Sequence, residues 1–208
     1  MRVLGRCGGF TSDIADGLIW ASGGTVSGVP ANANPARVAN LSLGGSGACG
    51  TTMQSAVNSA RSRGMTVVVA AGNSNANAGN FTPANCGGVV TIAAVNRGGG
   101  KAFYSNFGAV VDVAAPGGDV RTSAANGILS TLNSGTTTPG GDSFAFYQGT
   151  SMATPHVAGV AALMLARNSS LTPDQVETHL RNTARAFPAT CSQCGYMEIG
   201  RASCRERV

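Results

Sequence analysis

Residues 149–159, which read Gly-Thr-Ser-Met-Ala-Thr-Pro-His-Val-Ala-Gly, have the strongest potential for chemistry in this 208-residue chain. Gly149 permits a tight turn, and Ser151 follows at the start of a run that reads as a helix. The unpaired N–H groups and the dipole of a helix N-terminus favour negative charge. This setting suits a serine nucleophile, because its attack on a carbonyl creates an oxyanion. The alternative is that Ser151 only caps the helix.

The elements that must hold this segment are predicted from alternating apolar and helical runs. Residues 38–43 read as a strand that ends at Gly44-Gly45. Continuous apolar runs at residues 66–71, 89–95 and 110–114 are typical of strands buried on both faces of a parallel sheet. Helices are predicted over residues 12–22 (N-cap Ser12), from Thr51 or Thr52 as N-cap to residue 63 with Gly64 after the end, after Gly149, and over residues 173–184 (N-cap Thr172, first residue Pro173). The alternation predicts an α/β fold of three layers, in which helices flank a mostly parallel sheet.

Three blocks, in this order along the chain, resemble the subtilisin-like serine protease family. Residues 40–45 (Asn-Leu-Ser-Leu-Gly-Gly) resemble the strand beside which the substrate backbone pairs, and residues 70–73 (Ala-Ala-Gly-Asn) resemble the oxyanion-hole block. Residues 149–159 match the nucleophile motif almost letter for letter, and Phe107-Gly108 and residues 114–117 add to the similarity. The resemblance covers about residues 1–195 and implies a serine endopeptidase with a subtilisin-like sheet whose N-terminal strands are missing.

The resemblance implies a role for individual positions. Ser151 would be the nucleophile, and Asn73 would donate its side-chain amide to the oxyanion together with the backbone N–H of Ser151. Asn73 also follows a predicted buried strand, which is where open α/β sheets place ligand groups. An extended peptide would pair with the backbone of residues 42–44 as an added strand. The substrate-binding residues implied are Ser42, Leu43, Gly44, Gly45, Ala71, Gly72, Thr82, Pro83, Ala84 and Thr150. The segment Thr82-Pro83-Ala84-Asn85 would line the primary specificity pocket.

Acyl transfer by a serine also needs a base and a carboxylate that orients the base. The chain has two histidines. His156 lies five residues after Ser151 and hence about 140° around a helix, so we expect it to pack and His179 to lie on the surface. The Asp and His blocks of the family do not occur. We therefore expect residues 1–197 to be a partial peptidase domain that starts at an internal methionine or a sequence break, is inactive alone and exposes a sheet edge.

The last eleven residues, 198–208, resemble the conceptual translation of a sequencing adapter, and we exclude them from the native domain. The alternative is a genuine basic tail.

Five cysteines then remain. The predicted pairs are Cys49 with Cys86 and Cys191 with Cys194, which leaves Cys7 without a partner. Residues 191 and 194 could instead form a metal or redox site, although zinc would require a second such pair. Paired cysteines indicate an oxidising, extracellular location.

Composition limits the partners. The net charge is +5, but the basic residues are scattered, so we expect no nucleic-acid partner. No apolar stretch reaches the length of a membrane span, and no signal peptide opens the chain. We expect a secreted monomer that acts on peptide or protein substrates and needs no cofactor for catalysis. Structural calcium is frequent in the family, but no ligand cluster is identifiable.

Three alternatives belong to other classes. A non-catalytic, peptide-binding pseudoprotease would have no reason to keep residues 149–151 together with Asn73. A sedolisin-type protease places an acidic residue at the oxyanion position, where this chain has Asn73. An α/β-hydrolase requires a second glycine in its nucleophile turn, and Ala153 stands there.

Overall fold

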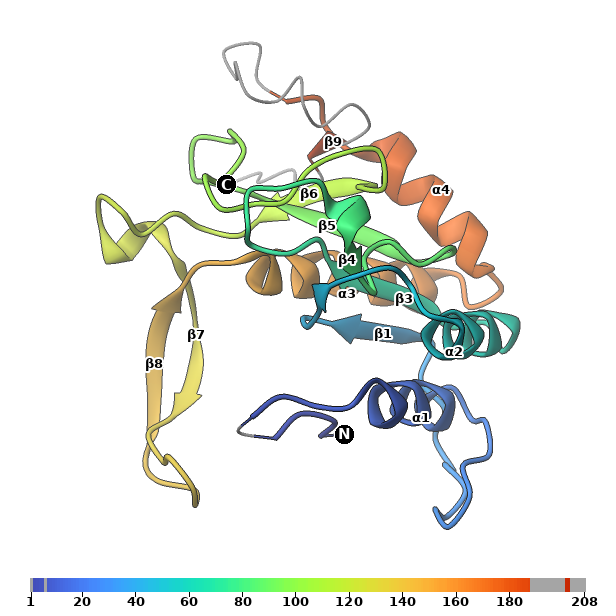
Figure 1. Cartoon of the computed structure of the whole chain (residues 1–208). Helices are drawn as coiled ribbons and strands as arrows, with labels where there is room; N and C mark the ends of the chain where they lie inside the picture. The colour runs from blue at the N-terminus through green and yellow to red at the C-terminus, as the bar shows by residue number, and fades with distance from the viewer. Residues whose placement is uncertain (1, 6, 188–200, 203–208) are drawn as a thin grey trace.

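A five-stranded parallel sheet forms the centre of the protein, as the computed structural model shows for the described residues 2–5, 7–187 and 201–202 (Figure 1). Its strand order is β1-β3-β5-β6-β9. The strands are β1 (Val38–Leu41), β3 (Thr66–Ala70), β5 (Val90–Val95), β6 (Val113–Pro116) and β9 (Arg201–Ala202). Strands β3 and β5 are buried along their whole length, as their continuous apolar runs predicted. The predicted α/β fold with a mostly parallel sheet is confirmed.

Helices cover both faces of this sheet. On one face, α3 (Thr150–Arg167) and α4 (Pro173–Thr183) pack through Val157 and Val176 against Val68 and Ile92. On the other face, α2 (Thr51–Ser62) and α1 (Thr11–Ala21) pack in a second cluster that includes Val67. Neighbouring residues of β3 therefore point into different layers, as the two-residue period of a strand requires.

The helix ends were predicted correctly only in part. Thr172 caps α4 in a capping box with Gln175, and Pro173 is the first helical residue, as predicted. The predicted caps of α1 and α2 are wrong, because α1 begins two residues earlier than a Ser12 cap requires and α2 begins at Thr51 itself. Phe10 precedes α1 and Gly50 precedes α2, and neither provides a side-chain cap.

Two strand boundaries also differ from the predictions. The run at residues 38–43 leaves the sheet after Leu41, so Ser42 and Leu43 are free to face the site described below. In the run at 110–114 only Val113 and the residue after it are strand. Val111 is nevertheless 1% exposed, because it packs in a third core cluster without pairing in the sheet. Burial, not strand pairing, accounts for its apolar character.

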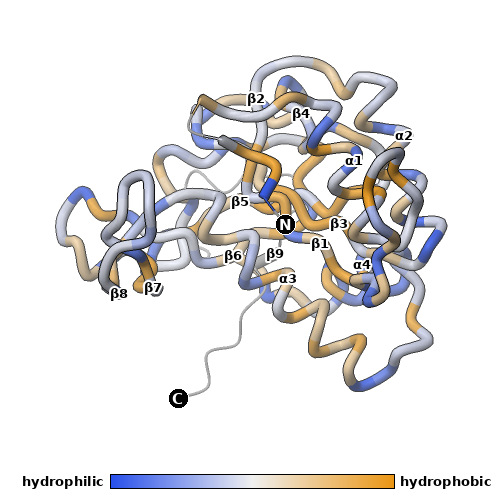
Figure 2. Tube along the Cα trace, turned by 90° about the horizontal axis from the view of Figure 1, so that it is seen from below, coloured by the Kyte–Doolittle hydropathy of each residue, from blue (hydrophilic) through white to orange (hydrophobic). Residues whose placement is uncertain are grey.

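Short elements connect the layers. A two-residue pair joins β2 (Gly45–Ser46) to β4 (Phe81–Thr82), and η1 (Ala78–Asn80) precedes β4. After η2 (Ala124–Asn126), an antiparallel hairpin of β7 (Ile128–Asn133) and β8 (Asp142–Tyr147) stands away from the sheet in both views (Figures 1 and 2). This hairpin was not predicted, because its apolar residues do not alternate regularly.

The sheet ends in β1 on one side and β9 on the other. Within the described residues β1 pairs only with β3, which leaves its outer edge open, as expected. Strand β9 lies in the segment that was excluded from the native domain, and it pairs in parallel with Val113 and Ala114 of β6. Within the part of the chain that the structure describes, no helix has the length and hydropathy that a bilayer span requires.

Candidate active site

The predicted site residues meet at the carboxyl ends of β1 and β3, where parallel sheets place their ligands. Ser42 follows β1, Asn73 follows β3, and the N-terminus of α3 brings Ser151 to the same place. These segments surround a cavity of about 620 Å³. Its lining consists of Ser42, Leu43, Gly44, Gly45, Ser46, Ala70, Ala71, Gly72, Asn73, Ser74, Phe81, Thr82, Thr150 and Ser151.

Ser151 is the second residue of α3, where backbone N–H groups lack partners within the helix. Gly149 precedes the helix with a φ of 152°, a conformation that favours glycine. The Ser151 hydroxyl donates to the carbonyl of Ser42 at 3.4 Å, and the Ser42 hydroxyl donates to the carbonyl of Ser151 at 2.8 Å. Ser151 and the segment that follows β1 are thus in direct contact.

The side chain of Asn73 has a defined orientation. Its Oδ1 accepts hydrogen bonds from the backbone N–H of Thr150 at 2.8 Å and from the Thr150 hydroxyl at 2.9 Å. The Nδ2 group therefore points the other way and lies 3.6 Å from the position of a Cβ built on Gly149. Within the described residues Nδ2 donates no hydrogen bond, so it is available to an oxyanion beside Ser151.

Tyr104 forms a hydrogen bond with Gly149, the residue before helix α3. Its hydroxyl lies 2.8 Å from the carbonyls of Gly117 and Gly118 and accepts the N–H of Gly149 at 2.9 Å. The side chain is 7% exposed, and burial raises the pKa of its phenol well above the usual value. Tyr104 therefore acts as a neutral hydrogen-bonding group and not as a base. The sequence analysis did not single it out, because nothing in the local pattern distinguishes it from a core aromatic.

Neither histidine approaches Ser151. His156 is half-buried, and its Nδ1 lies 2.8 Å from the carbonyl of Met152, one helical turn back. His179 lies on the exposed side of α4. Among the residues that the structure describes, no histidine or carboxylate forms a hydrogen bond with the Ser151 hydroxyl.

The predicted substrate-binding residues divide into three sets. Residues 42–45, Ala71, Gly72 and Thr82 line the cavity. Pro83 and Ala84 are buried and absent from the lining of this cavity, and the Ala84 carbonyl accepts from the Thr91 hydroxyl at 2.7 Å, so their place in a specificity pocket stays a prediction. Thr150 is completely buried, and its hydroxyl is bonded to Asn73 and to the N–H of Gly72.

Four residues that line the cavity were missed. They are Ser46, Ala70, Ser74 and Phe81. Phe81 and Ser46 enter through the β2–β4 pair, in which they oppose each other, and a two-residue pairing leaves no periodic signal in a sequence.

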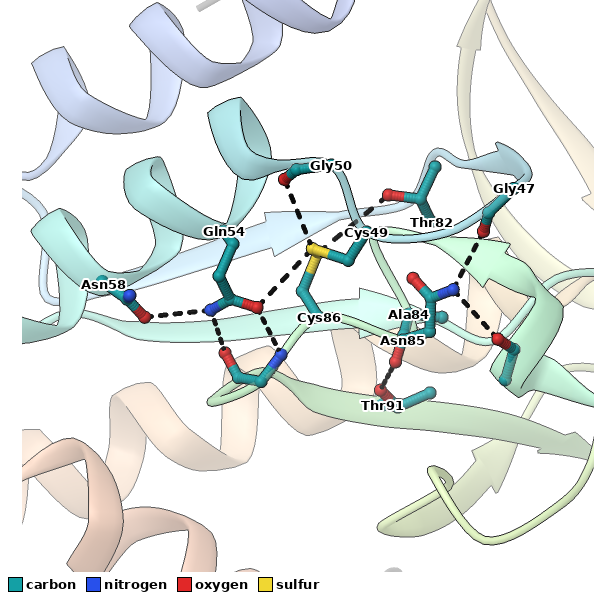
Figure 3. The surroundings of a disulfide bond; sticks show 12 residues. Gly47, Cys49, Gly50, Gln54, Asn58, Thr82, Ala84, Asn85, Cys86 and Thr91 are labelled. Atoms are coloured by element: carbon teal, nitrogen blue, oxygen red, sulfur yellow. Dashed lines mark hydrogen bonds between the residues drawn. A yellow bond between two sulfur atoms is a disulfide. The ribbon is translucent and has the colours of Figure 1, made fainter.

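A disulfide joins Cys49 to Cys86 beside the cavity, with a Cα–Cα distance of 5.1 Å (Figure 3). The predicted pairing is confirmed. Gln54 of α2 supports the same region, since it donates to the carbonyl of Gly87 at 2.9 Å and accepts the Gly87 N–H at 2.8 Å. The disulfide thereby joins the loop after β2 to the loop after β4. Cys7 is an exposed free cysteine, whereas Cys191 and Cys194 lie outside the described residues.

Within those described residues, no cluster of three or more histidine, cysteine, aspartate or glutamate side chains is placed to hold a metal ion.

Several known proteins are similar to this chain. An extracellular protease of Xanthomonas campestris pv. campestris is 61% identical over 197 residues, which are 94% of this chain and 33% of that protein. Subtilisin Savinase of Lederbergia lenta is 39% identical over 191 residues, which are 91% of this chain and 61% of that protein. Among solved structures, a protease from Pseudoalteromonas arctica has a TM-score of 0.89 at 60% identity, and the match covers 93% of this chain and 57% of that one.

The chain thus spans about a third of the length of the Xanthomonas protease and less than two thirds of Savinase. The model of the subtilase family matches residues 1–196 of the 208. On this match, and with the parallel sheet described above, the chain belongs to the subtilase family.

Proposed function

We propose that residues 1–197 are part of the catalytic domain of a secreted serine endopeptidase. Ser151 is the nucleophile, and Asn73 Nδ2 together with the backbone N–H of Ser151 binds the oxyanion. The observation that carries this proposal is the orientation of Asn73. Two hydrogen bonds from Thr150 hold its Oδ1, so the donor end of the amide is turned toward the nucleophile turn. A donor fixed in advance stabilises developing charge without reorganisation.

The reaction follows from this arrangement. The Ser151 oxygen attacks the peptide carbonyl, and the carbonyl oxygen becomes an anion between the two donors. Collapse of the tetrahedral intermediate expels the amine and leaves an acyl-enzyme, which water then hydrolyses. The proton of Ser151 passes to a base and from there to the leaving amine. We place this base and its carboxylate in a part of the complete protein beyond the present 208 residues, and the greater length of the relatives supports this placement.

The substrate class follows from the cavity and its neighbours. Residues 42–44 leave strand β1 and run along the cavity, so an extended peptide can pair with them. Secretion is supported by the Cys49–Cys86 disulfide and by the names of relatives such as the extracellular protease of Xanthomonas. We further propose that the 208-residue chain is inactive alone, because Ser151 lacks a base among the described side chains.

Labelling with a fluorophosphonate, which reacts with activated serines, tests this proposal. The complete open reading frame that contains these residues should be labelled and should hydrolyse casein, and Ser151→Ala should abolish both. The 208-residue chain should be folded but unlabelled. Hydrolysis by the isolated chain would overturn its proposed inactivity.

One observation favours a second candidate, a peptide-binding domain without catalysis. The Ser151 hydroxyl is engaged by the Ser42 carbonyl and has no base beside it among the described residues. If the complete protein binds casein peptides but is neither labelled nor hydrolytic, this candidate replaces the endopeptidase.

A further inference from the structure

One short segment contacts both the turn before Ser151 and the loop that carries Asn73. Residues 101–106, here called the clamp segment, follow the turn after β5 and are buried except for Phe103. Tyr104 of this segment holds the Gly149 N–H below the nucleophile. The side chains of Lys101 and Asn106 bond the loop at residues 71–76, which carries Asn73. The position of this segment therefore fixes the two catalytic groups relative to each other.

Asn106 makes the densest set of contacts with that loop. Its Nδ2 donates to the carbonyl of Ala71 at 2.8 Å, and its Oδ1 accepts the N–H groups of Ser74 at 2.9 Å and Ala76 at 3.1 Å. Its own N–H donates to the carbonyl of Gly72 at 2.9 Å. The side chain is completely buried. Asn106 therefore bonds the backbone on both sides of Asn73 without contacting the cavity.

Gly72 shows how closely Asn106 approaches the loop. Gly72 has a φ of 103°, and a Cβ built on it would lie 2.3 Å from Asn106 Nδ2. The loop thus takes a conformation that favours glycine in order to pass over the asparagine side chain.

Lys101 and Tyr104 both form hydrogen bonds with Asn75 of the loop. The Lys101 ammonium donates to Asn75 Oδ1 at 2.7 Å and to the carbonyls of Ala102 and Ser105 at 3.3 and 3.2 Å. The Asn75 N–H donates to the Tyr104 carbonyl at 2.8 Å, and Asn75 has a positive φ of 48°. Residue 75 is therefore held in a left-handed conformation by two contacts from the clamp segment.

We propose that Asn106 is a positioning residue of the oxyanion site, which acts through the loop at residues 71–76 to hold the Asn73 amide at its working distance from Ser151. The proposal rests on the proposed function of Asn73. A displacement of about 1 Å of a catalytic group can reduce the rate about 10²-fold. Loss of the three side-chain hydrogen bonds of Asn106 should therefore lower kcat by about tenfold to 10²-fold, with a smaller change in KM, because the oxyanion that Asn73 would bind forms only in the transition state.

A double-mutant cycle in the complete protein separates positioning from general stability. If Asn106 acts through Asn73, Asn106→Ala lowers kcat in the wild-type background and has little further effect in the Asn73→Ala background. If it only stabilises the fold, the two losses multiply. Asn106→Asp keeps the acceptor for Ser74 and Ala76, so it should retain more of kcat than Asn106→Ala, and it replaces Asn106→Ala in the cycle if the latter does not fold.

Asn133 provides a matched control. At the tip of the β7–β8 hairpin it forms the same three types of bond, since its Oδ1 accepts from Gly135 and Gly140 at 2.9 and 2.7 Å and its Nδ2 donates to the Gly140 carbonyl at 2.9 Å. Asn133→Ala should leave kcat within about twofold of the wild type, because side chains at exposed positions contribute little. Equal losses in Asn133→Ala and Asn106→Ala would overturn the proposal.

A second measurement remains valid if the complete protein proves inactive. In the 208-residue chain, NMR spectra should show that Asn106→Ala shifts the side-chain amide signals of Asn73 and speeds hydrogen exchange at Ser74 and Ala76, whereas Asn133→Ala changes none of them. Inactivity of the wild-type complete protein would refute the proposed function alone. Unchanged Asn73 signals in Asn106→Ala would refute the clamp, whatever the activity.

Discussion

The corner at the candidate active site, defined by residues 71–76, 101–106 and 149–151, and the arm, formed by β7 and β8, have similar hydrogen bonds in different surroundings. Each has an asparagine that accepts two backbone N–H groups and donates to one carbonyl, Asn106 in the corner and Asn133 in the arm. Asn106 is 0% exposed, whereas Asn133 is an exposed residue. Hydrogen bonds are electrostatically stronger in a buried setting. The difference teaches that burial, and not the bonding pattern, makes the corner suitable for holding a catalytic group.

The arm is also apolar where the corner is polar. Leu129, Leu132, Phe144, Phe146 and Tyr147 are all at least 40% exposed, and they lie on both faces of a two-stranded ribbon. A hairpin of this kind has little stability of its own. We therefore expect the arm to open locally at a low free-energy cost, and the corner to open only when the whole domain unfolds.

The largest effect is expected from the residue at the centre of the corner. In the complete protein, Asn73→Ala should lower kcat by about 10²–10³, the magnitude measured for the oxyanion donor of subtilisin itself, with KM little changed. Steady-state kinetics on a peptide substrate measure this loss. Asn133→Ala in the arm is the control and should change kcat by less than about twofold. A loss below about fivefold in Asn73→Ala would mean that the Ser151 N–H binds the oxyanion without help.

Truncation of one large apolar side chain in each region comes next. Ile92 lies at 0% exposure in β5, in the core cluster below the corner, and Ile92→Ala should reduce the free energy of unfolding by about 2–5 kcal/mol. Leu129 of β7 is 55% exposed, and Leu129→Ala should reduce it by less than about 0.5 kcal/mol. Urea unfolding of the 208-residue chain measures both. Equal losses would show that the arm packs on the domain in solution, contrary to the structure.

The sequence predicted the corner better than the arm for a physical reason. The corner depends on short motifs whose residue types are dictated locally, such as Gly149 at a positive φ and Ser151 at a helix start. The buried strands β3 and β5 also have a clear signal, because both faces need apolar residues. The arm lacks any such requirement, since its side chains face solvent on both sides and any mixture of residues is tolerated.

The contacts that link distant segments could not be predicted either. Asn106 reaches residues more than 30 positions away in the chain, and Tyr104 reaches Gly149 over 45 positions. Only the fold brings such groups together, and a buried asparagine looks like any other in a sequence. The Cys49–Cys86 disulfide was the exception, because few cysteines are available to pair.

A matched pair of glycines sharpens the comparison at a smaller scale. Gly72→Ala should reduce the free energy of unfolding by about 1–3 kcal/mol, because its φ is positive and the new Cβ would displace Asn106. Gly141 in the arm has an ordinary φ, and its nearest neighbour to a new Cβ is the Ser134 hydroxyl at 3.8 Å. Gly141→Ala should therefore stabilise the chain by about 0.4–1 kcal/mol through the unfolded state. Thermal unfolding of both variants tests the opposite signs, and a stabilising Gly72→Ala would contradict the described loop.

The smallest expected effect is a pH dependence that belongs to the corner. Lys101 is the only lysine of the sequence, and its buried ammonium has three oxygen partners but no carboxylate among the described residues. Burial lowers the pKa of this ammonium below its usual value of 10.5. Between the lowered pKa and 10.5, the unfolded chain binds more protons than the folded chain, so the contribution of Lys101 to the free energy of unfolding rises with pH. The slope is limited to about 1.4 kcal/mol per pH unit, the value for one whole proton.

Lys101→Met removes this contribution while it fills the same space. Urea unfolding of wild type and variant at pH 7 to 10.5 should show a difference that is constant near pH 7 and shifts in favour of the wild type as the pH approaches 10.5. Titrating tyrosines are present in both proteins and cancel in the difference. The arm has no buried ammonium, so a variant there, such as Leu129→Ala, should show a difference independent of pH. A flat difference for Lys101→Met would mean that water reaches the ammonium and that this side of the corner is as open as the arm.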